Sequence, residues 1–248
     1  MSSTEYQVDR RELHFVVNET LQAGKLCEFP DFAEFDEEMF TMIINEASTF
    51  AEQVLAPLNV NGDRQGCRIE NGAVVTPDGF TDAWKQLGEG GWLSMSLPPE
   101  FGGQGIPELI AVIGKETQLA ANQGFTIGAS LTTGAANLIY NFGSDVQKNE
   151  FCQNMFSGKW AGTMCLTEPH AGSAVGDVIT SATKQEEGHY LIKGTKQFIT
   201  NGDHDMADNI VHLLLARTPN SQQGSKGISL FIVPKKRPDG SKNDITLV

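Results

Sequence analysis

The sequence predicts an α+β multidomain fold, with an α-helical N-terminal domain over residues 1–158 and a β-barrel-like domain over residues 159–248. Two observations carry this prediction. Before Lys159-Trp160, apolar residues recur at the spacing of a helix. After it, apolar runs are short, rich in β-branched residues and separated by turn formers. This change of period places the domain boundary at about residue 159.

In the N-terminal half, the first helical pattern covers residues 9–22. A second begins after Asp36, a residue type suited to a helix N-cap, and is expected to end at Pro57 because proline breaks a helix interior. Residues 59–78 are polar and rich in turn formers, which predicts a loop. Further helical patterns are Phe80 to Leu87, Pro107 to Asn122, Thr126 to Phe142 and Asp145 to Phe156.

The β half contains the most informative stretch, residues 162–202. Thr163 to Leu166 form a short apolar run typical of a buried strand, which ends at Thr167-Glu168-Pro169. The loop from His170 to Gly176 consists of small residues, and exposed N–H groups in such a loop can approach a phosphate. Further strands are expected over Val178 to Lys184, over His189 to Lys193, and at Phe198, Ile199 and Thr200 before Asn201-Gly202.

Composition and charge exclude several classes of protein. With 18 Lys and Arg against 31 Asp and Glu, the net charge of −13 disfavours nucleic acid or an anionic membrane as a partner. No stretch reaches the about 18 apolar residues of a membrane span, and the N-terminus lacks a signal-peptide core, so a cytoplasmic protein is the default expectation. The 4 cysteines have neither C-x-x-C pairing nor accompanying histidine spacing, which disfavours zinc, other metal sites and a disulfide framework.

Two motifs considered together indicate a family. The segment Cys165 to Ser173, CLTEPHAGS, followed by Gly194 to Gly202, GTKQFITNG, resembles the middle-domain signature of acyl-CoA dehydrogenases. Phe101 to Gly105 and Asp208 to Arg217 resemble two further segments of that family. The long subfamily is matched by Leu55-Ala56-Pro57-Leu58-Asn59, Gly91-Trp92, His204-Asp205 and Gly227 to Phe231.

The resemblance implies FAD-dependent α,β-dehydrogenation of an acyl-CoA thioester, with electron-transferring flavoprotein as the acceptor of electrons and a homo-oligomer or a partner subunit as the assembly. In the family, the glutamate that removes the α-proton lies in a second helical domain that follows the middle domain. The chain is therefore expected to be a truncated or partial form without a catalytic residue of its own. Glu168 is not expected to substitute, because its position in the family pattern belongs to the loop scaffold.

The resemblance also assigns a cofactor role to individual residues. Phe198 would pack on the isoalloxazine, with Ile199 next to it, and the Thr200 hydroxyl would bond near N5. Leu166 and Thr167 would line the ring, with Met164 and Cys165 close by. Gly172 and Ser173 would face the flavin pyrophosphate or the pantetheine of CoA, so Ser173 is also a candidate substrate contact. Taken singly, Phe198 would more often be a core residue, Thr200 a strand residue and Ser173 a turn former.

One departure from the family pattern lies in the loop from His170 to Gly176, directly after Gly172 and Ser173. Ala174 stands where the family has aspartate, and the loss of a carboxylate acceptor is expected to loosen the loop by about 1 kcal/mol. Two other functions remain open for the same fold: a non-catalytic structural subunit of a heteromeric acyl-CoA dehydrogenase, and, with less support from the motifs, a flavin monooxygenase.

Overall fold

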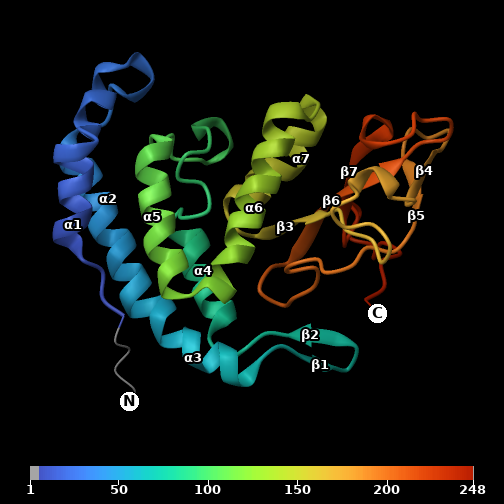
Figure 1. Cartoon of the computed structure of the whole chain (residues 1–248), viewed down its shortest axis with the longest axis horizontal. Helices are drawn as coiled ribbons and strands as arrows, with labels where there is room; N and C mark the ends of the chain where they lie inside the picture. The colour runs from blue at the N-terminus through green and yellow to red at the C-terminus, as the bar shows by residue number, and fades with distance from the viewer. Residues whose placement is uncertain (1–5, 248) are drawn as a thin grey trace.

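The computed structural model describes residues 6–247 of the chain. Helices occupy one part of the molecule and a β-sheet the other, with α6 and α7 lying between the remaining helices and the sheet (Figure 1). A helical N-terminal region followed by a β region confirms the predicted fold class. The helices are α1 (Arg10–His14), α2 (Glu37–Phe50), α3 (Ala56–Gln65), α4 (Phe80–Glu89), α5 (Glu108–Ala121), α6 (Gln123–Phe142) and α7 (Asp145–Phe156).

Helix starts follow from capping chemistry. The Asp36 side chain accepts from the N–H of Met39 at the start of α2, as its residue type predicted. Ser144 and Gln147 form a reciprocal capping box that begins α7 one residue after Ser144. Local signals of this kind explain why several helix boundaries could be predicted from sequence.

The expectation that Pro57 ends the second helix is wrong. Residues Ala51–Leu55 form a π-helical turn, in which the Ala56 N–H bonds to the Ala51 carbonyl, and α3 continues from Ala56 to Gln65. Pro57 therefore lies in the first turn of α3, where a missing N–H costs little. The wider turn before it shifts the hydrogen-bond register, which a pattern of apolar residues does not reveal.

Residues 59–78 are also more regular than predicted. After α3, strands β1 (Arg68–Glu70) and β2 (Ala73–Val75) form an antiparallel hairpin around Asn71-Gly72. Asn71 and Gly72 both have positive φ, which is the conformation that a two-residue hairpin turn requires. The predicted turn is present, but short strands lie on either side of it.

The β region is a mixed five-stranded sheet with β6 (Asn209–Arg217) at its centre. Strand β3 (Trp160–Cys165) runs parallel to β6 on one side, and β7 (Ile228–Pro234) runs antiparallel on the other. Strand β4 (Ser181–Lys184) joins the end of β6 at the Ser181–Arg217 pair and forms an antiparallel hairpin with β5 (Tyr190–Lys193). The topology brings the end of β3 and the start of β4 to the same region of the sheet.

Packing of the helices against β3 fixes the two parts to each other. Helix α6 lies on β3, and the Thr132 hydroxyl in α6 accepts from the Gly162 N–H at 2.9 Å. The Trp84 ring of α4 donates its Nε1–H to the Gly158 carbonyl at 2.8 Å just before β3. Among residues 6–247, no helix is both long enough and apolar enough to cross a membrane.

Candidate functional site

A buried ion pair lies at the end of β3. The carboxylate of Glu168 accepts from Lys196 Nζ at 2.8 Å, and their side chains are 1% and 7% exposed. Lys196 Nζ also donates to the Leu166 carbonyl at 3.0 Å. Glu168 further accepts from the N–H groups of Ile179 and Thr180 and from the Thr180 hydroxyl. One carboxylate thus joins the end of β3, the entry to β4 and the segment that contains Lys196.

These contacts determine the ionisation of Glu168. Burial alone would raise the pKa of its carboxyl, but the hydrogen bonds from Lys196, Thr180 and the N–H of Ile179 outweigh burial and lower the pKa to about 2. A carboxylate in this state has its acceptor sites occupied and a weak affinity for a proton. The geometry fits a scaffold role and disfavours Glu168 as a general base.

Phe198, Ile199 and Thr200, which follow Lys196, were predicted to lie on a strand, but this prediction is wrong because none of the three is on a strand. The Gln197 N–H bonds to the Thr167 carbonyl at 2.8 Å, and the chain then turns at Phe198 and Asn201, which have φ values of 57° and 53°. Left-handed residues interrupt an extended strand. Residues 198–202 therefore form a loop beside the end of β3.

Phe198 is an outlier in two respects. A positive φ is unfavourable for a bulky L-residue, and its ring is 83% exposed. Asn201, by contrast, tolerates a positive φ, and its side chain lies against α6, where a Cβ added at Gly128 would be 1.7 Å from Asn201 Nδ2. The loop is therefore held at Lys196 and at Asn201, with the Phe198 ring presented between them.

The small-residue loop after Glu168 begins with a tight turn. Glu168 and Ala171 exchange two backbone hydrogen bonds of 2.9 and 3.1 Å. Within residues 6–247, the N–H groups of Gly172, Ser173 and Ala174 donate no hydrogen bond, and these three residues are exposed. Consecutive free N–H groups are a suitable arrangement for binding an anion.

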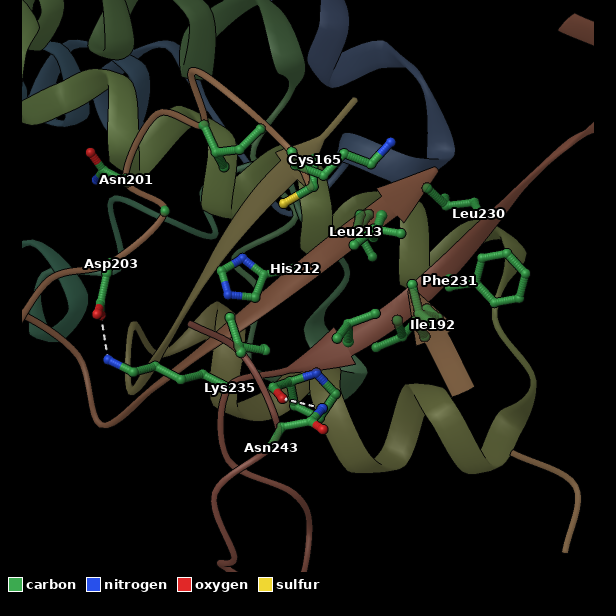
Figure 2. A pocket seen from close by; sticks show the side chains of 18 of the residues that line it. Cys165, Ile192, Asn201, Asp203, His212, Leu213, Leu230, Phe231, Lys235 and Asn243 are labelled. Atoms are coloured by element: carbon green, nitrogen blue, oxygen red, sulfur yellow. Dashed lines mark hydrogen bonds and ion pairs between the residues drawn. The ribbon is translucent and has the colours of Figure 1, made fainter. Parts of the chain in front are cut away.

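A wide cleft of about 1800 Å³ opens beside the site. Figure 2 shows His212 of β6 near the middle of the view, with Cys165 and Leu213 next to it and Leu230 and Phe231 farther away on the right. The cleft lining also contains Phe198 and Ile199 of the exposed loop. The cleft is wider than a typical pocket for a small ligand, so it can hold a large ligand or a further polypeptide segment.

The floor of the cleft carries buried polar groups. His212 Nδ1 lies 2.7 Å from the Thr163 hydroxyl, while Lys235 and Asp203 form an ion pair at the edge (Figure 2). Burial lowers the pKa of both His204 and His212 to about 4. Both rings are therefore neutral near pH 7, and the Nε2 atom of each is buried without a partner within the described residues.

Comparisons with known proteins decide the family. The profile of the acyl-CoA dehydrogenase N-terminal domain matches residues 37–159, and that of the acyl-CoA dehydrogenase middle domain matches residues 163–246. The chain belongs to the acyl-CoA dehydrogenase family. The resemblance seen in the sequence motifs is thereby confirmed.

Several members of the family are similar over most of this chain. The 3-methylmercaptopropionyl-CoA dehydrogenase of Ruegeria pomeroyi is 40% identical over 230 residues, which are 93% of this chain and 39% of the relative. Glutaryl-CoA dehydrogenase from Mycobacterium smegmatis, solved in complex with FADH2, aligns with a TM-score of 0.64 at 26% identity over 82% of this chain and 47% of that chain. A chain from the structure of the electron transferring flavoprotein of Acidaminococcus fermentans aligns with a TM-score of 0.67 at 30% identity over 82% and 49%.

This chain is much shorter than these relatives. This chain spans about two fifths of the curated acyl-CoA dehydrogenase and about half of the solved chains. The activity, substrates and partners of a whole acyl-CoA dehydrogenase are therefore a matter for proposal.

The structure brings together some of the residues that the acyl-CoA dehydrogenase motifs single out. Cys165, Phe198 and Ile199 line the cleft, while the backbone of Leu166 and Thr167 is bonded to the segment before Phe198. Thr200 lies exposed two residues after Phe198. Gly172 and Ser173 lie on the neighbouring loop.

Met164 and Cys165 point to opposite faces of β3, because successive side chains of a strand alternate. Cys165 is buried on the cleft side with Thr163, whereas Met164 is partly exposed on the other. The two side chains therefore cannot contact the same surface of a ligand from within the strand.

Three residues that hold the site were not assigned a role by sequence reasoning. Lys196 lies within the motif GTKQFITNG, and a lysine at this place next to a turn could have indicated a role in holding the site. Thr180 and Arg217 gave no such signal, because Thr180 acts on Glu168 across 12 positions and Arg217 binds main-chain carbonyls. Every residue has a main-chain carbonyl, so the sequence does not reveal which carbonyls accept a hydrogen bond from Arg217.

Proposed function

We propose that this chain binds FAD at the end of β3 and takes part in the α,β-dehydrogenation of an acyl-CoA thioester. The observation that carries the proposal is Phe198, an aromatic ring that is 83% exposed on a backbone with φ 57° at the edge of the cleft. Strained residues of this kind are retained where a functional contact needs them. Stacking on a flat aromatic ligand would bury the ring and account for its placement.

The residues around Phe198 fit the parts of a flavin dinucleotide. Leu166 and Thr167 lie beside the loop and offer an apolar surface and a hydroxyl for the ring. The Thr200 hydroxyl would donate a hydrogen bond near N5. The free N–H groups of Gly172, Ser173 and Ala174 suit the negative charge of the pyrophosphate. The FADH2 complex of the similar glutaryl-CoA dehydrogenase supports the choice of cofactor.

In the proposed reaction, the bound flavin supplies the acceptor for the β-hydride of the thioester. The chain itself holds and orients this acceptor. Phe198 would cover one surface of the bound ring and shield it from water, and the Thr200 hydroxyl would offer a donor where negative charge increases during hydride transfer. Ser173 would contact the pyrophosphate or the pantetheine. The ion pair of Glu168 and Lys196 keeps these loops in register.

The α-proton requires a base that Glu168 does not provide, because its carboxylate is occupied and its pKa is lowered to about 2. This observation favours a second candidate function, in which the chain is a subunit that holds the flavin or an interface while another polypeptide supplies the base. A homo-oligomer or a partner subunit, with electron-transferring flavoprotein as acceptor, belongs to the same proposal. Nothing in the site favours a flavin monooxygenase over a dehydrogenase.

The test combines a flavin spectrum with substrate. The purified chain is incubated with FAD, freed of excess cofactor and examined by visible absorbance, then mixed anaerobically with a medium-chain acyl-CoA. Retained flavin that bleaches would support a dehydrogenase with a base supplied in the assembly. Retained flavin that stays oxidised with a panel of acyl-CoA substrates would support the second candidate function, a flavin-holding subunit. No retained flavin would contradict FAD binding by this chain and would leave only a subunit that provides an interface. Oxygen consumption without thioester binding would instead indicate a monooxygenase.

A further inference from the structure

Arg217, at the end of β6, binds main-chain carbonyl groups through most of its guanidinium. Its Nε donates to the Val178 carbonyl at 2.8 Å, and one terminal nitrogen donates to the Gln222 carbonyl at 2.9 Å. The other terminal nitrogen donates to the carbonyls of Gly176 and Gly224. A single side chain therefore holds two separate segments. One is residues 176–178, which follow the exposed N–H groups of residues 172–174 (the candidate phosphate loop), and the other is residues 222–224 before β7.

The arrangement is specific to a planar fork of donors. Within residues 6–247, Arg217 forms no ion pair with a carboxylate, so its N–H groups are directed to carbonyls. Gly227 makes room for this contact, because a Cβ there would lie 1.7 Å from the Gln222 carbonyl and 2.7 Å from the guanidinium. A lysine has three donors around one atom and cannot reproduce the fork.

Two of the four carbonyls connect Arg217 to the candidate phosphate loop. Gly176 and Val178 belong to the turn in which the Asp177 N–H bonds to the Ala174 carbonyl at 2.9 Å. The next two N–H groups, of Ile179 and Thr180, bond to Glu168. The exposed N–H groups of residues 172–174 thus lie between the turn closed by Glu168 and the turn held by Arg217.

We propose that Arg217 is a positioning residue for phosphate binding: its guanidinium fixes residues 174–178, so that the free N–H groups of Gly172, Ser173 and Ala174 point together at an anion. This inference rests on the proposed binding of FAD. It also offsets the missing carboxylate at Ala174, because the loop is held through its carbonyls instead of through an aspartate side chain. Arg217 acts through the loop and needs no contact with the flavin.

The experiment compares two flavins that differ in phosphate. FAD carries a pyrophosphate and an adenosine that riboflavin lacks, so the ratio of their dissociation constants reports binding beyond the ring and ribityl chain. The change of this ratio on substitution of Arg217 reports the effect of the residue on that part of the ligand. The whole chain is prepared as wild type, Arg217→Met, Arg217→Lys and Arg10→Met. The last is a control, because the guanidinium of Arg10 is also held by hydrogen bonds, two of 2.8 Å to Glu52, but Arg10 lies outside the cleft lining. Flavin fluorescence gives both constants, and thermal unfolding without flavin shows that each variant is folded.

Arg217→Met is expected to weaken FAD binding about tenfold or more while riboflavin binding changes less than about twofold, since charge-assisted contacts to phosphate depend on geometry. Arg217→Lys should fall between wild type and Arg217→Met, and Arg10→Met should match wild type. An unchanged ratio in folded Arg217→Lys or Arg217→Met would overturn the role of Arg217 while FAD binding itself stands. Wild type that binds neither flavin would overturn the proposed function and this inference with it.

Discussion

At the scale of single residues, the site depends on a conformation that most side chains avoid. Phe198 has φ 57°, a region in which glycine pays no steric penalty. Comparing Phe198→Gly with Phe198→Ala isolates the backbone strain at position 198, because both variants remove the exposed ring and differ only in the Cβ. The glycine variant should have the higher free energy of unfolding, by about 1 kcal/mol, which reverses the usual order of these two residues. Urea unfolding measures the difference, and an alanine variant of equal or higher stability would contradict a left-handed Phe198.

A second residue-scale prediction concerns the buried ion pair. Glu168→Gln and Lys196→Met should each lower the free energy of unfolding by about 3 kcal/mol, because each leaves a buried charge without its partner. The double variant should lose less than the sum of the two, since no unpaired charge remains. Arg10→Met is the control: it breaks the more exposed pair with Glu52 and should cost about 1 kcal/mol or less. Single-variant losses as small as that of the control would refute the role of the Glu168–Lys196 pair.

At the scale of elements, strand β6 carries the buried His212 into the cleft and begins shortly after a second buried histidine, His204. Since the pKa of His204 and of His212 is lowered to about 4, the unfolded chain binds more protons than the folded chain between about pH 6.5 and pH 4. The free energy of unfolding should therefore fall as the pH drops through this window, by up to about 1.4 kcal/mol per pH unit for each histidine, and should not depend on these groups above pH 7. The charged groups acting on them are Asp203, Asp205 and Lys235.

The pH dependence can be assigned with two variants. His212→Asn should reduce the slope of unfolding free energy against pH between pH 6.5 and pH 4, even if its stability at pH 7 is lower than that of wild type. His189→Asn, which removes an exposed histidine of the turn before β5, is the control for the loss of an imidazole that is not buried. Equal slopes in both variants would show that His212 titrates normally in the folded chain.

How far sequence predicts these elements depends on the range of the forces that shape them. Helices α5 and α7 could be predicted because apolar spacing in α5 and the capping residues of α7 are local signals. The π turn before Pro57 could not, because a pattern of apolar residues does not reveal a change in hydrogen-bond register. Phe198 to Thr200 have the composition of a strand, yet Lys196 is pinned to Glu168, 28 positions away, and the chain turns there instead. The motif residues of the candidate site could be named, whereas the loop geometry around Arg217 could not.

At the scale of the whole molecule, the cleft exposes apolar side chains. The large apolar residues that line it and remain exposed are Leu138, Phe142, Tyr190, Leu191, Phe198, Leu230, Ile245 and Leu247. Exposed apolar patches of this kind favour association, while the net charge of −13 opposes it. We expect the 248-residue chain to self-associate at micromolar concentration, and more strongly at high salt, which screens the repulsion.

Light scattering across a salt series tests this expectation. Leu230→Glu places a charge in the cleft and should reduce association. Ile69→Glu is the control, because Ile69 is also apolar and is even more exposed, at 70% against 43% for Leu230, but lies on the β1–β2 hairpin outside the cleft lining. A monodisperse wild-type monomer at every salt concentration would contradict the prediction, and equal effects of the two substitutions would remove the cleft as its cause.

The central claim is that the exposed loop with Phe198 binds a flavin, and FAD titration of the whole chain tests it most directly. Wild type, Phe198→Ala and Phe29→Ala are compared. Phe29 is the control, because it is also an exposed phenylalanine but lies in the helical region, far from Phe198 in the sequence. Loss of ring stacking should weaken FAD binding by about 1–1.5 kcal/mol, roughly tenfold, in Phe198→Ala alone. Wild type that does not bind FAD, or a Phe198→Ala variant that binds it as tightly as wild type, would contradict the account.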